Sequence, residues 1–265
     1  MSKLSIIIPS RNEPYLQKTI DDIFKHSEAD IEVVVGFDGC DIDHSISGCK
    51  MYNTKEPIGQ RAMQNKLVEL SNSKYIMKLD AHCSLQQGFD RIMLESMEDN
   101  MVMTPILCRL RTEHDNWTIE PKPFTKKYYF DTNMIFQYAT KEEEDKDDNK
   151  LVETMALQGS CFVVERDTYF KWNLCDEKYG SWGFQGSEVA CKTWLNGGRV
   201  VTNTDVFYGH MFRTDNLPYT RPKKEVDEAM RCAQQLKKHP KMEWLVKKFN
   251  YPCDWTDDWS NNWVK

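Results

Sequence analysis

The chain has 265 residues, of which 40% are hydrophobic and 29% are charged, and its formal net charge is −6. This length gives one large domain or two small ones, with a core that needs no disulfide or structural metal. The mixed composition excludes an intrinsically disordered chain, and the lack of any run of about 18 apolar residues excludes a membrane-spanning helix.

The N-terminal segment and the cysteines indicate the compartment. The apolar run from Leu4 to Ile8 ends at Pro9 and is too short for the apolar region of a signal peptide. The nine cysteines are scattered without a CxxC pair, which argues against a zinc cluster and against an ordered disulfide framework. We therefore expect reduced thiols and a cytoplasmic protein.

Two hydrophobic periods alternate through the first hundred residues. Short apolar runs that end at proline, glycine or aspartate predict strands, and apolar positions at helical spacing predict helices. Strands are predicted at 4–8, 31–37, 75–79 and 101–107, and helices at 15–24, 59–70 and 89–97. Because strands alternate with helices, we predict an α/β fold with a mostly parallel sheet, flanked by helices, and a binding crevice at its strand ends.

The second half of the chain is less regular. Residues 108–150 lack a clean period, and 141–150 (KEEEDKDDNK) form a charge run that is typical of a solvated loop. A strand is predicted at 159–164, a helix at 186–196 and an amphipathic helix at 222–238. The tail from Tyr251 holds three Trp and is expected to pack over the body.

The most specific local signal is Lys78-Leu79-Asp80-Ala81-His82, directly after a predicted strand. In extended backbone the side chains at i and i+2 point the same way, so Asp80 and His82 share a face. One oxygen and one nitrogen ligand suit a divalent cation such as Mn²⁺, which would neutralise the diphosphate of a nucleotide as it leaves. The pair alone is a weak signal, because most pairs with this spacing bind no metal.

Two downstream segments carry further polar groups. His210 precedes Arg213 in YGHMFR, and an arginine there could clamp a phosphate. Trp182 and Glu188 bracket a glycine-containing turn at the start of a predicted helix. Each has a structural alternative: a lone histidine is more often structural than a ligand, Trp182 could belong to the core, and Glu188 could be a partner of the helix dipole.

Taken in chain order, the segments around Asp38, Asp80, Trp182 and His210 resemble those of nucleotide-sugar glycosyltransferases with the GT-A fold. The resemblance extends to the large family 2 and is closer to the catalytic domain of polypeptide N-acetylgalactosaminyltransferases. The DxH pair with a downstream GHxFRxxxPYT is specific to the latter group, whereas the N-terminal pieces are shared at the level of the fold. The matching stretches are SIIIPSRNEPYLQKTI (5–20), IEVVVGFDG (31–39), GQRAMQNKLVELSNSKYIMKLDAHC (59–83), VMTPIL (102–107), CDEKYGSWGFQGSE (175–188) and GHMFRTDNLPYT (209–220).

The resemblance implies a metal-dependent enzyme that moves a sugar from a nucleotide-sugar, a UDP-sugar, to an acceptor hydroxyl, with Mn²⁺ or Mg²⁺ as cofactor. It implies a GT-A domain at 1–220, with a nucleotide-binding half at 1–107 and an acceptor-binding half at 108–220. Residues 221–265 would form a C-terminal helical extension that packs on this domain.

The resemblance also assigns residues by position. Asp38 would hydrogen-bond the uracil, and Arg213 would lie on a loop that closes over the donor. The residues implied at the nucleotide are Pro9, Arg11, Asn12, Glu13, Asp38, Arg61 and Asp80; those at the metal are Asp80, His82 and His210; those in catalysis are Trp182, Gln185, Glu188 and Arg213.

Two positions depart from the family pattern. The family reads W-G-G-E-N-x-E, and this chain has Gln185 in place of the first carboxylate. Gln185 cannot take a proton, so base catalysis falls to Glu188 or no base is used. The second alternative favours a retaining, front-face mechanism in which the leaving phosphate accepts the proton of the acceptor. Gly36 and Phe37 also replace an acidic and apolar pair before Asp38, which bears on how the base is recognised.

The resemblance leaves the acceptor open: its hydroxyl would belong to a glycan, a protein or a small molecule, or to a hydroxymethylated base in DNA, as for a phage-type enzyme. For DNA, residues 221–248 carry nine basic and four acidic residues, and KPFTKKYYF (122–130) mixes lysines with aromatic rings. Against DNA, the whole protein is acidic, and either stretch could be a solvated surface.

Two other classes of protein are weighed. A non-catalytic nucleotide-sugar-binding protein could have lost its base, with Gln185 as the trace, but retention of all three metal ligands argues against it. A nucleotidyltransferase would carry a glycine-rich phosphate loop, which SIIIPSRNEPY lacks. Since neither a membrane anchor nor a C-terminal lectin domain is evident, we expect a bacterial or phage enzyme.

Overall fold

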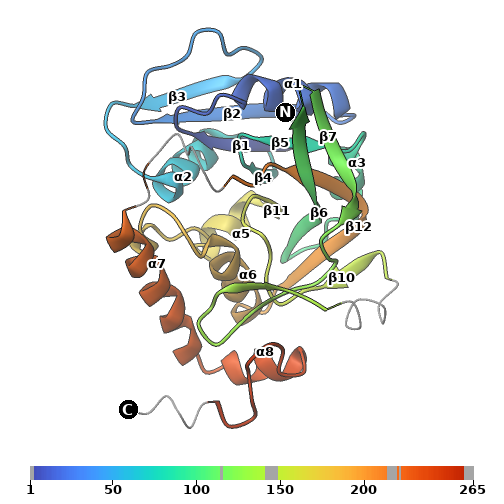
Figure 1. Cartoon of the computed structure of the whole chain (residues 1–265), viewed down its shortest axis with the longest axis vertical. Coiled ribbons are helices and arrows are strands. Elements are labelled where there is room, and N and C mark those ends of the chain that lie inside the picture. The colour runs from blue at the N-terminus through green and yellow to red at the C-terminus, as the bar shows by residue number, and fades with distance from the viewer. Residues whose placement is uncertain (1–2, 114–115, 141–148, 214–219, 221, 260–265) are drawn as a thin grey trace.

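The structure, a computed structural model, describes residues 3–113, 116–140, 149–213, 220 and 222–259. A large sheet with the strand order β10-β12-β6-β11-β4-β1-β2-β3 forms its centre, and helices flank it (Figure 1). β5 pairs with β12, β7 pairs with β6, and β8 and β9 form a separate two-stranded sheet. The strands are β1 (Leu4–Ser10), β2 (Ile31–Asp38), β3 (Lys50–Thr54), β4 (Tyr75–Leu79), β5 (Cys83–Leu85), β6 (Met101–Glu113), β7 (Asn116–Pro123), β8 (Tyr128–Phe130), β9 (Phe136–Tyr138), β10 (Leu151–Glu153), β11 (Cys161–Glu165) and β12 (Arg199–His210).

The helices alternate with the strands in the N-terminal half and gather at the C-terminus. They are α1 (Leu16–His26), α2 (Gln60–Leu70), α3 (Phe89–Ser96), α5 (Arg166–Lys171), α6 (Gln185–Leu195), α7 (Lys223–Gln235) and α8 (Met242–Lys248), with short 3₁₀ turns η1 (Glu177–Tyr179) and η2 (Leu236–Lys238).

The N-terminal half is the predicted α/β unit. β3, β2, β1 and β4 are parallel neighbours, and β1 is covered on both faces, which explains its continuous apolar run. α1 turns Leu16, Ile20 and Ile23 into the core at helical spacing. The carboxyl ends of β1, β2 and β4 therefore meet at one edge of the sheet, where parallel α/β proteins bind ligands.

The second half departs from the sequence pattern in several places. Residues 108–140 hold the end of β6 and the strands β7 to β9; β7 is largely exposed along its length, so no apolar alternation marks it. β12 is a long strand whose register with β6 shifts between Asn203 and Phe207. β11 runs antiparallel between β4 and β6. The central sheet is thus mostly parallel, as predicted, with antiparallel additions.

The C-terminal segment packs against the body. α8 contacts α6, and α7 contacts η1. Trp255 and Trp259 are buried, and the indole N–H of Trp255 donates to the carbonyl of Phe130 at 2.8 Å. The third Trp of the tail, and residues 141–148 of the charge run, lie outside the described residues. All nine cysteines are free thiols, as expected. Within the described ranges, no helix has the length and apolar character needed to cross a bilayer.

Candidate active site

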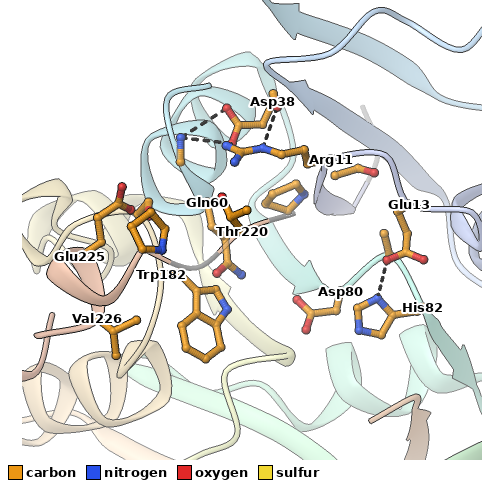
Figure 2. Close-up of a pocket in the computed structure, with 16 residues that line it drawn as sticks. Arg11, Glu13, Asp38, Gln60, Asp80, His82, Trp182, Thr220, Glu225 and Val226 are labelled. Atoms are coloured by element: carbon orange, nitrogen blue, oxygen red, sulfur yellow. Dashed lines mark hydrogen bonds and ion pairs between the residues drawn. The ribbon is translucent and has the colours of Figure 1, made fainter. Parts of the chain in front are cut away.

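Two cavities open side by side at the carboxyl ends of the parallel strands. Cavity 1 lies over the ends of β1 and β2 (Figure 2), and cavity 2 lies between β12 and the start of α6. They share Gln60, Asp80, His82 and Trp182. The residues that line cavity 1 include Pro9, Ser10, Arg11, Glu13, Asp38, Gly59, Thr220, Pro222, Glu225 and Val226; those of cavity 2 include Lys78, Phe136, Gly159, Gln185, His210, Phe212 and Arg213.

Asp38 anchors one end of cavity 1. It is the last residue of β2 and is 4% exposed. Its carboxylate accepts hydrogen bonds from the backbone N–H of Ile58 at 2.7 Å and of Gly59 at 3.1 Å, and it forms an ion pair with the guanidinium of Arg11. The Nε of Arg11 also donates to the backbone carbonyl of Asp38 at 2.9 Å. Arg11, which is partly exposed, therefore presents the remaining donors of this pair to the cavity.

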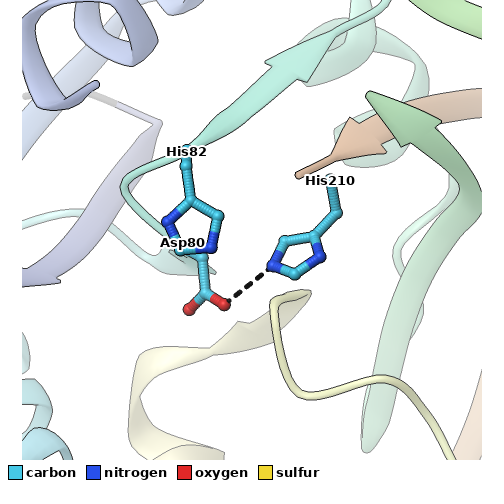
Figure 3. Close-up of side chains that lie close together, drawn as sticks. All are labelled: Asp80, His82 and His210. Carbon is cyan, nitrogen blue, oxygen red and sulfur yellow. Dashed lines mark hydrogen bonds and ion pairs between the residues drawn. The ribbon is translucent and has the colours of Figure 1, made fainter. Parts of the chain in front are cut away.

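Three side chains with metal-binding atoms converge where the two cavities meet. One ligand atom from each of Asp80, His82 and His210 lies within 4.8 Å of the other two (Figure 3). Nε2 of His210 is 3.2 Å from Oδ2 of Asp80, and the ring centroids of His82 and His210 are 4.9 Å apart. The pairing of β5 with β12 creates this arrangement, because His210 is the register partner of Cys83, the residue after His82.

The charges around the cluster suit a divalent cation. Burial opposes ionisation of Asp80, but Lys78 and His210 outweigh it and hold the pKa of Asp80 well below its usual value. Burial lowers the pKa of His210, although Asp80 opposes this shift, so the neutral imidazole is favoured. A carboxylate with two imidazole nitrogens is a donor set for Mn²⁺ or a similar ion, and it leaves positions for phosphate oxygens and water.

Glu13 links the cluster to Arg213. Its carboxylate lies 3.1 Å from Nδ1 of His82 and forms an ion pair with Arg213. Burial opposes its ionisation, but the contacts with His82 and Arg213 lower the pKa of Glu13 below the usual value. The guanidinium of Arg213 also lies over the ring of Tyr15. Arg213 is thus held at the edge of cavity 2, while residues 214–219 lie outside the described residues.

Gln185 and Trp182 contribute to the second cavity. Gln185 is 7% exposed, and its Nε2 donates to Oε1 of Gln64 at 2.7 Å and contacts Sγ of Cys175 at 3.2 Å. Trp182 lines both cavities, and its ring is drawn between α7 and Asp80 in Figure 2. Both residues, which the resemblance assigns to catalysis, therefore lie at the wall of cavity 2.

Glu188 and Arg61 do not reach either cavity. Glu188 is fully buried and Arg61 is 1% exposed, and their side chains pair with each other at 3.0 Å. The other oxygen of Glu188 accepts from the backbone N–H of Asp176 and from Lys192, both at 2.7 Å. Arg61 donates to the carbonyls of Gly180 and Gly183, on either side of Trp182. The structure therefore places Arg61 and Glu188 beside the cavities and not in their lining, where the resemblance had put them, because the two side chains form a buried ion pair.

Asn12 is also displaced from its expected place. It has φ of 51° in the tight turn after β1 and lines neither cavity, whereas Pro9, Arg11 and Glu13 around it line cavity 1. Conversely, Gln60, Lys78 and Glu225 reach the cavities without having been predicted. Lys78 could have been noticed in the sequence, because it is a charged residue inside the otherwise apolar strand YIMKL. Glu225 lies on α7 and lines cavity 1 beside residues that are distant from it in sequence.

The two stretches that could favour DNA differ in exposure, because the rings of β8 are buried whereas most basic residues of 222–248 are exposed. Tyr128 and Phe130 are fully buried, so these rings cannot stack on bases. In the basic segment, Lys237 donates to the carbonyl of Thr132, and Lys248 pairs with Glu153 at 2.6 Å. The aromatic argument for a DNA surface is therefore wrong for β8.

Comparison with known sequences identifies the family. The model of glycosyl transferase family 2 matches residues 5–169. The chain belongs to glycosyltransferase family 2. A human protein, polypeptide N-acetylgalactosaminyltransferase 10, is 23% identical over 237 residues, which are 82% of this chain and 39% of that protein. A Drosophila melanogaster protein described as putative polypeptide N-acetylgalactosaminyltransferase 13 is 23% identical over 63% of this chain and 30% of its own length. This family 2 chain thus spans about a third of the length of these relatives.

Solved structures confirm the fold. The crystal structure of GalNAc-T7 with UDP, GalNAc and Mn²⁺ has a TM-score of 0.76 at 18% identity, over 89% of this chain and 48% of that one. The structure of residues 1–349 of Staphylococcus aureus TarS in complex with UDP-GlcNAc has a TM-score of 0.62 at 14% identity, over 93% of this chain and 71% of that one. The predicted GT-A arrangement is therefore confirmed for this family 2 chain.

Proposed function

We propose that this chain is a metal-dependent glycosyltransferase that moves a sugar from a UDP-sugar to an acceptor hydroxyl, with Mn²⁺ or Mg²⁺ as cofactor. One observation carries the proposal: Asp80, His82 and His210 converge at the junction of two cavities. A leaving diphosphate has to lie at such a junction, because it belongs to the donor and is released where the acceptor attacks. The UDP in the GalNAc-T7 structure and the UDP-GlcNAc in the TarS structure support the choice of donor.

The lining residues suggest that the two cavities bind different parts of the substrates. Cavity 1 holds the Arg11–Asp38 pair at the end where a base would lie, and Glu13 beside His82 at the other. Cavity 2 holds Trp182, Gln185 and Phe212, which would surround the transferred sugar and the acceptor. We assign cavity 1 to the nucleotide and cavity 2 to the sugar and the acceptor.

The residues of the chain would act mainly by position and charge. Asp80, His82 and His210 would hold the cation, which supplies neutralisation of the diphosphate as its bond to the sugar breaks. Arg213 lies at 3.2 Å from His82 and could exchange Glu13 for a phosphate oxygen. Trp182 would exclude water from the reacting bond.

Few side chains of cavity 2 could take the proton from the acceptor hydroxyl. Among the described residues that line cavity 2, Asp80 is the one carboxylate, and it belongs to the metal site. Gln185 cannot take a proton, and Glu188 is buried in its ion pair. This supports transfer with retention of configuration, in which an oxygen of the leaving diphosphate takes the proton. NMR of the anomeric proton of the product would test the configuration.

The acceptor that we propose is a hydroxyl of a glycan, a protein or a small molecule. A hydroxymethylated base in DNA is the alternative, and the buried rings of β8 remove one of its two supports. A duplex with this base, offered at low salt, would test that alternative by transfer of labelled sugar.

The experiment measures UDP release from UDP-GlcNAc and UDP-GalNAc with and without Mn²⁺, with water as the acceptor of the sugar. The wild type is expected to release UDP only with the metal, and His210→Ala should lose at least a hundredfold of this rate. His26→Ala is the matched control, because His26 also faces an aspartate at 3.2 Å but lines neither cavity. Binding of the UDP-sugar without any release would instead indicate the non-catalytic binding protein, and no binding at all would refute the proposal.

A further inference from the structure

Lys78 is a buried charge inside an apolar strand. It is 1% exposed, in the fourth position of β4, where the neighbouring residues Met77 and Leu79 are fully buried. Its ammonium group forms an ion pair with Oδ1 of Asp80 and donates to the carbonyl of Gly159 at 2.7 Å. Lys78 also lines cavity 2. A cation therefore already lies against the carboxylate of the candidate metal site.

The two oxygens of Asp80 have different neighbours. Oδ1 is held by Lys78, and Oδ2 faces Nε2 of His210 at 3.2 Å. Oδ2 is therefore the oxygen left for a metal, and the single negative charge of Asp80 is already balanced by the ammonium. The three ligands and Lys78 together have no net negative charge when both imidazoles are neutral.

A divalent cation at this site would add two positive charges close to the one on Lys78. Like charges repel strongly where burial lowers the effective dielectric constant. Two further positive groups, Arg11 and Arg213, are paired with Asp38 and Glu13 and add no net negative charge to the surroundings. The missing negative charge is what a nucleotide diphosphate would bring.

We propose that Lys78 makes metal binding at Asp80, His82 and His210 depend on the diphosphate of the donor. The ammonium weakens the binding of free Mn²⁺, and the charge of the diphosphate offsets the repulsion, so the ion binds with the nucleotide rather than before it. Because coupling is reciprocal, Mn²⁺ strengthens the binding of UDP by the same factor. This inference rests on the proposed function and adds the order in which the site is filled.

A purely structural role for Lys78 leads to a different result. If Lys78 served only to hold Asp80 and the Gly159 carbonyl in place, its removal would loosen a ligand and weaken Mn²⁺ binding with and without UDP. If the charge matters as proposed, removal strengthens the binding of free Mn²⁺. The sign of the change therefore separates the two roles.

The test is calorimetric titration of the full chain with Mn²⁺, with and without saturating UDP, for the wild type, Lys78→Gln and Lys78→Met. In the wild type, UDP should tighten Mn²⁺ binding at least tenfold. Each variant should bind free Mn²⁺ at least tenfold more tightly than the wild type, while the value with UDP changes much less. Lys192→Gln is the matched control, because Lys192 pairs with buried Glu188 at 2.7 Å and lines neither cavity.

The outcomes distinguish this inference from the proposed function. A wild type that binds neither Mn²⁺ nor UDP refutes the proposed function itself. A wild type that binds both without mutual tightening refutes the inference, even if neither variant folds. Unchanged or weaker binding of free Mn²⁺ by a folded variant, as judged by its melting temperature, also refutes the inference and leaves the proposed function intact.

Discussion

Glu188 is the residue whose role changes most between sequence and structure, and its removal makes the clearest prediction. Glu188→Ala would leave the guanidinium of Arg61, which is 1% exposed, without its counter-charge. Removing one partner of a buried ion pair costs about 3–5 kcal/mol. In a domain of this size each kcal/mol lowers the melting temperature by roughly 2–4 °C, so we expect a decrease of about 6–20 °C.

The same ion pair reaches the active site through the backbone. Arg61 donates to the carbonyls of Gly180 and Gly183, which flank the turn that carries Trp182. Loss of Glu188 should therefore also reduce donor affinity, by releasing this turn. Arg61 and Glu188 are positioning residues for Trp182 in this interpretation, and neither touches substrate.

The assay is urea unfolding and thermal melting, followed by UDP release at a temperature where the variant is folded. Glu69→Ala is the control, because Glu69 pairs with Lys66 at 2.8 Å on the surface, where a salt bridge is worth about 0–1 kcal/mol. Replacing both partners, as Arg61→Met with Glu188→Leu, should restore part of the lost stability. If Glu188→Gln instead melts like the wild type and binds UDP-sugar but transfers nothing, Glu188 acts in the chemistry and our reasoning is refuted.

Two further predictions concern cavity 1 and the C-terminal segment. Arg11→Met should weaken UDP binding at least tenfold in calorimetry, because the N–H donors that Arg11 adds beside Asp38 are lost. The control is Arg91→Met, in the exposed pair with Glu28, which should bind UDP like the wild type. Equal affinities of Arg11→Met and the wild type would show that Arg11 does not contact the nucleotide. Burial lowers the pKa of Lys237 to about 8, so between pH 8 and the ordinary lysine value the unfolded chain binds more protons and the free energy of unfolding rises with pH. Lys237→Met should remove this rise in urea unfolding at pH 7.5, 9 and 10, and an unchanged slope would refute the assignment.

Local patterns predicted the parts of the fold that local physics determines. The runs at β1, β2 and β4 are apolar because both faces of a central parallel strand are covered. Asp80 and His82 were expected to share a face of extended backbone, but β4 ends at Leu79 and His82 lies in the turn before β5, so this turn brings their side chains together. β7 and β12 were not predicted. β7 is largely exposed, and polar residues around Asn203 interrupt the apolar pattern of β12. Their places depend on partners that are distant in sequence.

Local pattern pointed to candidate residues that follow strands, and it could not place those that depend on tertiary contacts. His210 was assigned to the metal through the family resemblance, since only the pairing of β5 with β12 brings it to His82. α6 begins at Gln185, and Gln185, Gly186 and Ser187 line cavity 2, whereas the next side chain, that of Glu188, pairs with Arg61 in the core. Glu225 could not be found, because nothing local links α7 to cavity 1.

The surroundings of Gln185 bear on whether this chain has lost a base or never needed one. Its Nε2 donates to Oε1 of Gln64, and Nε2 of Gln64 in turn donates to the hydroxyl of Tyr169 at 3.2 Å, which donates to Oδ1 of Asn65 at 2.6 Å. This chain of donors fixes the amide of Gln64 with its oxygen toward position 185. A carboxylate at 185 would therefore face an acceptor while it is 7% exposed.

Gln185→Glu tests the alternatives directly. We expect a loss of about 1–3 kcal/mol of stability in urea unfolding, because a buried hydrogen bond is replaced by two opposed acceptors, and we expect no gain in the rate of UDP release. Gln64→Leu, combined with Gln185→Glu, removes the opposed acceptor and should recover part of the stability. A rate that rises severalfold in Gln185→Glu would show instead that position 185 is the place of a missing base. An unchanged rate would fit the proposal that an oxygen of the leaving diphosphate, and not a side chain at position 185, takes the proton of the acceptor.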